Sequence, residues 1–184
     1  FKRWLAADDN APYGSFGNGS AMRVAPIAWA FDSVDDVLRA AEQSAVVTHD
    51  HPEGVKGAQA TALAVYLARR GVGKRDIATE ITDRFGYALT KTPDEIRPTY
   101  TFDVTCQGSV PQSIVCFLAA DSFEDAVRTA ISLGGDADTM AAIAGSIAEP
   151  YFGGVPAEIE REVRIRMHPD LLDVLERFER AYPC

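Results

Sequence analysis

The segment of residues 52–70 constrains the fold of this chain more than any other segment does. Pro52 suits the first turn of a helix, where its missing N–H group has no helical partner to lose. The apolar residues after it lie on nearly every side of such a helix: Val55, Ala58, Ala62, Leu63, Val65, Tyr66 and Leu67. A helix that is apolar all round has no face to offer to water. We therefore expect it to be the buried central helix of a helical protein.

The flanking sequence predicts more helices and no sheet. Apolar residues recur at helical spacing, or form apolar runs, in residues 21–31, 33–46, 74–85, 111–120, 122–133, 140–148, 156–166 and 170–182. Residues 99–105 have strand-like composition, but with no partner strand nearby we expect an extended segment within a long irregular region, 86–112. Residues 156–166 are charged, which predicts a surface helix. The sum is an all-α fold of eight or nine helices.

Composition fits a single globular domain. A chain of 184 residues can bury a sizeable core. Its net charge of −9 argues against a protein that binds nucleic-acid phosphates, which needs a basic patch. Apolar runs stay well short of the roughly 20 residues of a membrane span, and the amino terminus lacks a signal-peptide pattern. The cysteines, Cys106, Cys116 and Cys184, are odd in number and lack metal-ligand spacing, so we expect reduced thiols in a cytoplasmic protein.

The turn Ser132-Leu133-Gly134-Gly135-Asp136-Ala137-Asp138-Thr139 is a candidate metal site. It places two carboxylates and a hydroxyl within four residues, and oxygen-only ligands suit Mg²⁺, Mn²⁺ or Ca²⁺. The small apolar residues of 140–148 allow neighbours to pack closely and hold the two aspartates rigidly. The alternative is that Asp136 or Asp138 only caps the following helix. The spacing by itself leaves both interpretations open.

Two further loops contain glycine or histidine. The segment Gly17-Asn18-Gly19-Ser20 can bring its backbone close to a ligand, although its composition favours a plain turn. In Thr48-His49-Asp50-His51 a zinc interpretation lacks a third ligand, which favours polar contacts to a ligand or helix capping by Asp50. Arg23 is expected to face an internal carboxylate and not a phosphate.

Four segments, taken in order, resemble the successive motifs of the ADP-ribosylglycohydrolase family, which includes the dinitrogenase reductase-activating glycohydrolases. They are Gly17-Asn18-Gly19-Ser20-Ala21-Met22-Arg23-Val24-Ala25-Pro26, Thr48-His49, Phe102-Asp103-Val104-Thr105-Cys106-Gln107-Gly108-Ser109-Val110-Pro111 and Leu133-Gly134-Gly135-Asp136-Ala137-Asp138-Thr139. The resemblance implies a compact, orthogonal multi-helix fold around a binuclear Mg²⁺ or Mn²⁺ site. It also implies hydrolysis of the bond between ADP-ribose and a protein side chain or small acceptor.

The resemblance assigns roles by motif position. The implied metal ligands are Asp136, Asp138 and Thr139. The implied ADP-ribose site is lined by Ser15, Phe16, Gly17, Asn18 and Gly19, and His49 contacts the ligand. A metal can polarise the ribose hydroxyls or activate water, and the breaking glycosidic bond develops oxocarbenium character. The general acid or base stays unassigned.

This sequence departs from the family pattern at its amino terminus. Family members are normally longer there and have a Thr-Asp-Asp motif, which supplies the other metal ligands and an acidic residue proposed to act in catalysis. Nothing before Phe16 matches it, and we interpret Asp8-Asp9 as a solvated loop pair. The chain also starts at Phe1 and not at Met. We therefore expect residues 1–184 to be the carboxy-terminal two thirds of one longer domain, holding half of the metal site.

Two functions follow from this departure. One is a metal-dependent hydrolase whose amino-terminal part is missing or lies on another chain. The alternative is a non-catalytic ADP-ribose or nucleotide binder, or a degenerate structural relative. The expected partners are an ADP-ribosylated protein or a small ADP-ribose conjugate, with no nucleic acid and no membrane. A missing segment would leave part of helix 52–70 exposed and would favour self-association.

Overall fold

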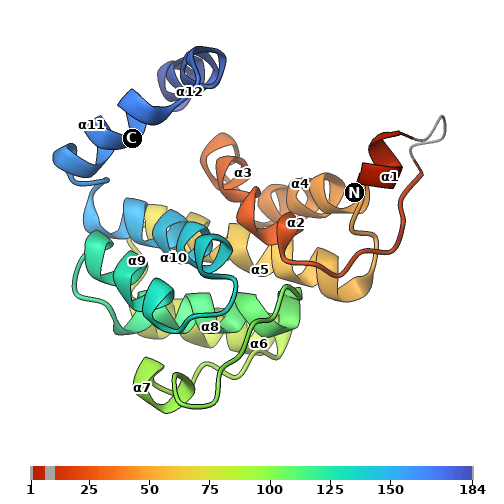
Figure 1. Cartoon of the computed structure of the whole chain (residues 1–184), viewed down its shortest axis with the longest axis vertical. Helices are drawn as coiled ribbons and strands as arrows, with labels where there is room; N and C mark the ends of the chain where they lie inside the picture. The colour runs from red at the N-terminus through yellow and green to blue at the C-terminus, as the bar shows by residue number, and fades with distance from the viewer. Residues whose placement is uncertain (1, 7–10, 184) are drawn as a thin grey trace.

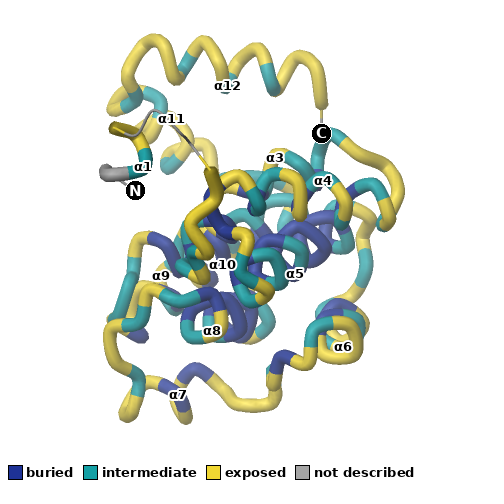
Figure 2. The backbone as a smooth tube through the Cα atoms, turned by 90° about the vertical axis from the view of Figure 1, so that its right-hand side faces the viewer, coloured by how far each residue is buried: buried dark blue, intermediate teal, exposed yellow. Residues whose placement is uncertain are grey.

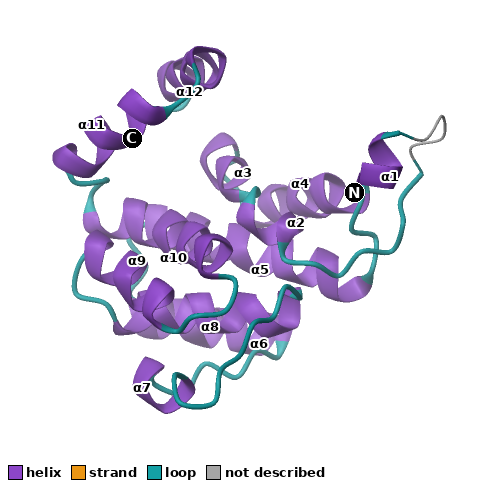
Figure 3. Cartoon of the chain, viewed as in Figure 1, coloured by secondary structure: helices purple, strands orange, loops and turns teal. Residues whose placement is uncertain are grey.

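A computed structural model describes residues 2–6 and 11–183, and these residues form twelve helices (Figure 1). The helices are α1 Lys2–Leu5, α2 Gly19–Met22, α3 Ala25–Ala30, α4 Val34–Val46, α5 Pro52–Arg69, α6 Lys74–Phe85, α7 Pro93–Ile96, α8 Cys106–Ala119, α9 Phe123–Ser132, α10 Ala137–Phe152, α11 Ala157–Arg166 and α12 Pro169–Ala181. The described residues contain no strand (Figure 3), and one isolated antiparallel bridge joins Gly17 to Thr105. The all-α prediction is confirmed.

The nine longer helices correspond to the nine predicted runs, and α1, α2 and α7 are additional helices of four residues each. Several boundaries differ from the prediction; α10, for example, extends beyond residues 140–148 at both ends. Helix α8 begins at Cys106 and not at Pro111, because the Thr105 side chain caps it by accepting a hydrogen bond from the Gly108 N–H group at 3.1 Å. The predicted turn at residues 17–20 ends early, since Gly19 already begins α2.

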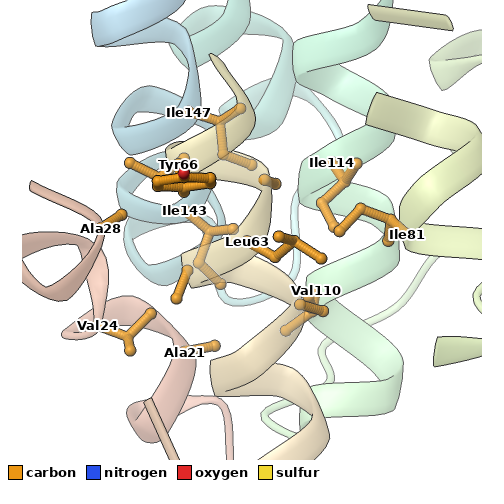
Figure 4. Packing of buried hydrophobic residues seen from close by; sticks show 14 of the residues in the cluster. Ala21, Val24, Ala28, Leu63, Tyr66, Ile81, Val110, Ile114, Ile143 and Ile147 are labelled. Carbon is orange, nitrogen blue, oxygen red and sulfur yellow. The ribbon is translucent and has the colours of Figure 1, made fainter. Parts of the chain in front are cut away.

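Helix α5 lies at the centre of the fold and is surrounded by α2, α3, α4, α6, α8 and α10. Most of its residues are buried, which Figure 2 shows as a dark core. Leu63 has no exposed surface and belongs to the same cluster as Ile114 of α8 and Ile143 of α10 (Figure 4). The prediction of a buried central helix is therefore right. Val55 and Leu67, its least buried apolar residues, are partly buried and pack against this cluster. The expectation that a missing segment leaves part of α5 exposed stays a prediction.

Small residues let neighbouring segments approach α5 closely at its amino-terminal end. A Cβ atom on Gly57 would overlap the Sγ atom of Cys106, the first residue of α8. A Cβ atom on Gly54 would lie 2.6 Å from the Ser15 carbonyl oxygen, closer than real Cβ contacts. The two glycines thus allow α8 and the loop before α2 to reach the same end of α5.

A second, smaller cluster lies between α7, α8, α9 and α10. Its buried members are Ile96, Val115, Cys116, Ala130, Leu133, Met140 and Ala144. Leu133 and Met140 flank the turn between α9 and α10, so burial of both holds the ends of that turn in place.

The two carboxy-terminal helices pack loosely on the rest of the chain. None of the described residues of α11 and α12 is buried. Figure 2 shows α12 along one edge of the molecule. Ile165 and Leu171 are 71% and 60% exposed. The predicted surface position of residues 156–166 is confirmed. Across the described helices, none combines the length and the hydrophobicity needed to cross a membrane.

We predict that Gly57→Ala destabilises the protein. Alanine favours a helix interior over glycine by roughly 1 kcal/mol, but the added methyl group must displace Cys106 and the start of α8. Overpacking of this kind typically costs about 1–3 kcal/mol and should exceed the propensity gain. Chemical denaturation measures the difference, with Gly73→Ala as the control because nothing lies within 4 Å of its added methyl group. Equal stability of the two variants would contradict the close packing of α5 against α8.

Candidate functional site

The glycine loop, residues 13–19, is joined by backbone hydrogen bonds to the start of α8 and to the loop that carries His49. The Asn18 N–H donates to the Val104 carbonyl at 2.8 Å, and the Cys106 N–H donates to the Phe16 carbonyl at 2.9 Å. On its other side, the Ser15 N–H donates to the Thr48 carbonyl at 3.4 Å. The loop therefore lies between the start of α8 and the loop that carries His49.

Asn18 connects the glycine loop to the acidic turn. Its side-chain Nδ2 donates to Asp136 Oδ2 at 2.7 Å and to Ser109 Oγ at 3.0 Å. Asn18 is only 6% exposed, so these are hydrogen bonds in a largely dry environment, where they are harder to replace with water. Residues 118 positions apart in the sequence thus meet at one side chain.

The acidic turn is shaped by two glycines in the left-handed region, Gly134 with φ of 78° and Gly135 with φ of 67°. A Cβ atom on Gly135 would lie 2.6 Å from Tyr100 Cε1, so the Tyr100 ring packs directly against this backbone. The Tyr100 hydroxyl donates to the Gly108 carbonyl at 2.8 Å. The ring thereby ties the acidic turn to the first turn of α8.

Asp136 occupies the N-cap position of α10, but within the described part of the chain its side chain makes no capping hydrogen bond. Its carboxylate instead accepts from Asn18. The pKa of Asp138 lies below its ordinary value, first because of its hydrogen bond with the Asp136 carboxyl and then because the N–H groups of Thr139 and of Asp138 itself stabilise the charge. The Asp136 side chain therefore does not act as a simple cap of α10 in this structure.

The three predicted metal ligands offer oxygen atoms only. Asp138 is exposed, Asp136 is partly buried, and Thr139 is buried with its hydroxyl 3.5 Å from Met22 Sδ. This donor set fits a hard divalent cation, which prefers six or more oxygen ligands. Neither at this turn nor elsewhere do the described residues bring together three or more histidine, cysteine, aspartate or glutamate side chains that could hold a metal ion. The turn by itself offers a cation three oxygen-bearing side chains, fewer than a full coordination shell needs.

His49 is 7% exposed and lies beside the glycine loop, with Nε2 3.3 Å from where a Cβ atom on Gly19 would be. Its Nδ1 lies 2.7 Å from Thr48 Oγ1, which also accepts a hydrogen bond from Arg23 at 3.2 Å. The tautomer of His49 sets the direction of this bond: with the imidazole proton on Nε2, the Thr48 hydroxyl donates to Nδ1. Burial lowers the pKa of His49, and the Arg23 charge lowers it further.

Two expectations about neighbouring residues are wrong. Arg23 faces the Thr48 hydroxyl and the Ser44 carbonyl, at 3.2 and 2.9 Å, and not a carboxylate. The cap of α5 is His51, whose Nδ1 accepts from the Glu53 N–H group at 3.1 Å. Asp50 instead accepts from the Gly14 N–H group at 2.6 Å and so anchors the glycine loop.

The structure places the six residues expected to contact a ligand in two touching loops. Ser15 Oγ accepts from the Gly17 N–H group at 3.2 Å, and the exposed Phe16 ring lies 5.2 Å from the His51 ring. Sequence reasoning missed Ser109 and Tyr100, although Ser109 lies inside one of the quoted motifs. The sequence gives less indication of a role for Tyr100, because an aromatic residue within 99–105 only adds to the strand-like composition of that segment. Asp8 and Asp9 lie outside the described residues.

A comparison with known families decides what kind of protein this is. The sequence profile described as ADP-ribosylglycohydrolase matches residues 1–182. The chain belongs to the ADP-ribosylglycohydrolase family. The ordered motifs and the all-α architecture are therefore those of an ADP-ribosylglycohydrolase domain.

Individual ADP-ribosylglycohydrolase relatives agree. The mouse ADP-ribosylhydrolase ARH3 is 33% identical over an alignment that covers 76% of this chain and 50% of the mouse protein. The ADP-ribosylarginine hydrolase Tri1 of Pseudomonas putida is 29% identical over 90% of this chain and 46% of that protein. A solved ADP-ribosylglycohydrolase-related protein complex matches with a TM-score of 0.75 and 26% identity, over 96% of this chain and 64% of that chain. This chain spans about half the length of the curated relatives it matches.

We predict that His49 titrates below the ordinary histidine pKa of about 6.5, because burial disfavours its charged form. The unfolded chain then takes up this proton at a higher pH than the folded chain does. The contribution of His49 to stability is therefore complete above about pH 6.5 and is lost as the pH falls below it. An NMR titration of the His49 ring measures the pKa, and Arg23→Gln should raise it. A midpoint at or above 6.5 would contradict the buried, neutral imidazole.

Proposed function

We propose that this chain carries the ADP-ribose site and part of the metal site of a hydrolase that removes ADP-ribose from a modified protein side chain or small acceptor. The observation that carries the proposal is the contact between Asn18 Nδ2 and Asp136 Oδ2 at 2.7 Å. It joins a glycine loop suited to close approach by a ligand to an acidic turn suited to a cation. The names of the mouse and Pseudomonas putida relatives, both hydrolases of ADP-ribose linkages, support the same reaction.

The glycine loop and His49 bind and orient the ADP-ribose in this proposal. Gly17 and Gly19 keep side-chain bulk away from His49, whose Nε2 lies 3.7 and 3.3 Å from the positions of their missing Cβ atoms. With the imidazole proton on Nε2, His49 can donate to a ribose or phosphate oxygen. Phe16 is 44% exposed and offers an aromatic face to an apolar part of the ligand.

Asp136, Asp138 and Thr139 would hold Mg²⁺ or Mn²⁺, since the same oxygen ligands suit both ions. When bound, such an ion supplies Lewis-acid polarisation of ribose oxygens or of a water molecule. The chain's own contribution is to hold the Asp136 carboxylate in place through Asn18 and to pack the turn against Tyr100. Both contacts orient the turn toward the glycine loop.

A specific observation favours the second candidate, a non-catalytic binder of ADP-ribose. The described residues place only Asp136 and Asp138 at the turn, with no third acidic or histidine side chain grouped beside them for a metal. Such a chain would bind the ligand through the glycine loop and would not turn it over.

The experiment that separates the two candidates is a hydrolysis assay. The chain is incubated with peptides ADP-ribosylated on arginine or on serine, with Mg²⁺ or Mn²⁺, and released ADP-ribose is measured by mass spectrometry. A hydrolase releases ADP-ribose, stops on chelation of the metal and resumes on its return. A binder shows ADP-ribose affinity in calorimetry without release. A chain with neither property would contradict both candidates.

We predict that Asp136→Asn weakens Mn²⁺ binding with little effect on folding. Removing the charge of a direct ligand should cost more than the roughly 10- to 100-fold loss typical of an outer-shell partner. The free energy of unfolding should change by no more than about 1 kcal/mol, the worth of one hydrogen bond. Calorimetric titration with Mn²⁺ and chemical denaturation measure the two effects. The control is Asp35→Asn, an exposed aspartate in the first turn of α4. Unchanged Mn²⁺ affinity would reject the ligand assignment.

A further inference from the structure

We propose that Ser109 is a positioning residue that fixes the orientation of the Asn18 amide and thereby aims its NH₂ group at Asp136. The importance of this orientation for metal binding rests on the proposed function, whereas the orientation itself does not. Ser109 lies in the first turn of α8, makes no hydrogen bond to Asp136 or Asp138, and contacts Asn18, which does bond to Asp136.

The surroundings of Ser109 make its hydroxyl an acceptor toward Asn18. The residue has no exposed surface. Its Oγ lies 2.8 Å from the Thr105 carbonyl oxygen and 3.0 Å from the Asp103 carbonyl oxygen. Both carbonyls can only accept, so the one hydroxyl hydrogen is committed to them. The lone pairs of Oγ are what remain for Asn18 at 3.0 Å.

An acceptor at this position selects one of the two orientations of the Asn18 amide. In the observed orientation the two hydrogens of Nδ2 go to Ser109 Oγ and Asp136 Oδ2. A flipped amide would place its oxygen against a hydroxyl and a carboxylate that both accept, and would leave buried groups unpaired. Ser109 therefore supports, together with the carboxylate itself, the orientation in which Asn18 donates to Asp136.

The orientation matters because Asp136 lacks the hydrogen bonds of an ordinary helix cap. Asn18 is the described side chain that donates to its carboxylate. A ligand carboxylate held by an outer-shell donor keeps its direction, and loss of such donors typically weakens metal binding about 10- to 100-fold. Ser109 thus influences the candidate cation site indirectly, through its hydrogen bond with Asn18 and the bond from Asn18 to Asp136.

The chain offers a matched control in Ser113, one turn further along α8. Ser113 also has no exposed surface, and its hydroxyl donates to the Ser109 carbonyl at 2.8 Å, four residues earlier. Ser109 makes the equivalent bond to Thr105. The two serines share burial, helix and the bond to the carbonyl four residues earlier. Ser109 differs in its contacts with Asn18, with the Asp103 carbonyl and with the Tyr100 side chain.

The first test observes Asn18 directly in the metal-free chain by NMR. We expect resolved side-chain NH₂ resonances for Asn18 in the wild-type chain and in Ser113→Ala, with slow hydrogen exchange. Ser109→Ala should shift these resonances and speed their exchange. Unchanged Asn18 resonances in Ser109→Ala would overturn the proposal. If Ser109→Ala does not fold, Ser109→Cys serves instead, because it keeps the volume and replaces the oxygen with a weak acceptor.

The second test measures Mn²⁺ affinity by calorimetry. We expect Ser109→Ala to weaken binding by about 10-fold or more, and Ser113→Ala to leave it unchanged. In an Asn18→Ala background, Ser109→Ala should cause no further loss, because the two residues act in series. Equal effects of the two serine variants, or additive effects of Ser109→Ala and Asn18→Ala, would overturn the proposal. A wild-type chain that binds no Mn²⁺ would contradict the metal part of the proposed function, and the NMR result alone would then decide on Ser109.

Discussion

Close packing around one apolar helix is the constraint on which the rest of this structure depends. Helix α5 can be surrounded by six other helices because so many of its residues are small and because none of its central positions needs water. Burial of apolar surface favours this arrangement, while the small side chains let neighbouring backbones come near. A larger residue at Gly54 or Gly57 would push away the segments that build the candidate site.

The site is a consequence of that packing at one end of α5. The loop before α2 passes over Gly54, and the first turn of α8 lies over Gly57. Both segments are then close enough to pair through the Gly17–Thr105 bridge. The buried polar side chains that result must find partners, since unpaired polar groups are costly in a dry interior. Asn18 finds them in Ser109 and Asp136, and this is how the acidic turn becomes part of the same site.

Two sequence expectations failed at polar residues for one physical reason. Asp50 is a better helix cap than His51 by residue type, but its carboxylate accepts from the Gly14 N–H group, which is distant in sequence, and His51 caps α5 instead. Arg23 was expected to meet a carboxylate and meets a hydroxyl and a carbonyl instead. A polar side chain in a loop has several partners of similar energy, and the tertiary arrangement decides which one is near. Apolar periodicity has no such ambiguity, because burial does not depend on the identity of the partner.

The sequence by itself determined the helical class, the central place of α5, the family and the candidate residues near the acidic turn. These follow from apolar periodicity and from ordered motifs, which are local properties of the chain. Only the tertiary structure decided which contacts the acidic turn makes. Asp136 accepts a hydrogen bond from Asn18, Asn18 also donates to Ser109, and the Tyr100 ring packs on Gly135. These contacts join residues far apart in the sequence, and their geometry exists only once α5, α8 and α10 have packed together.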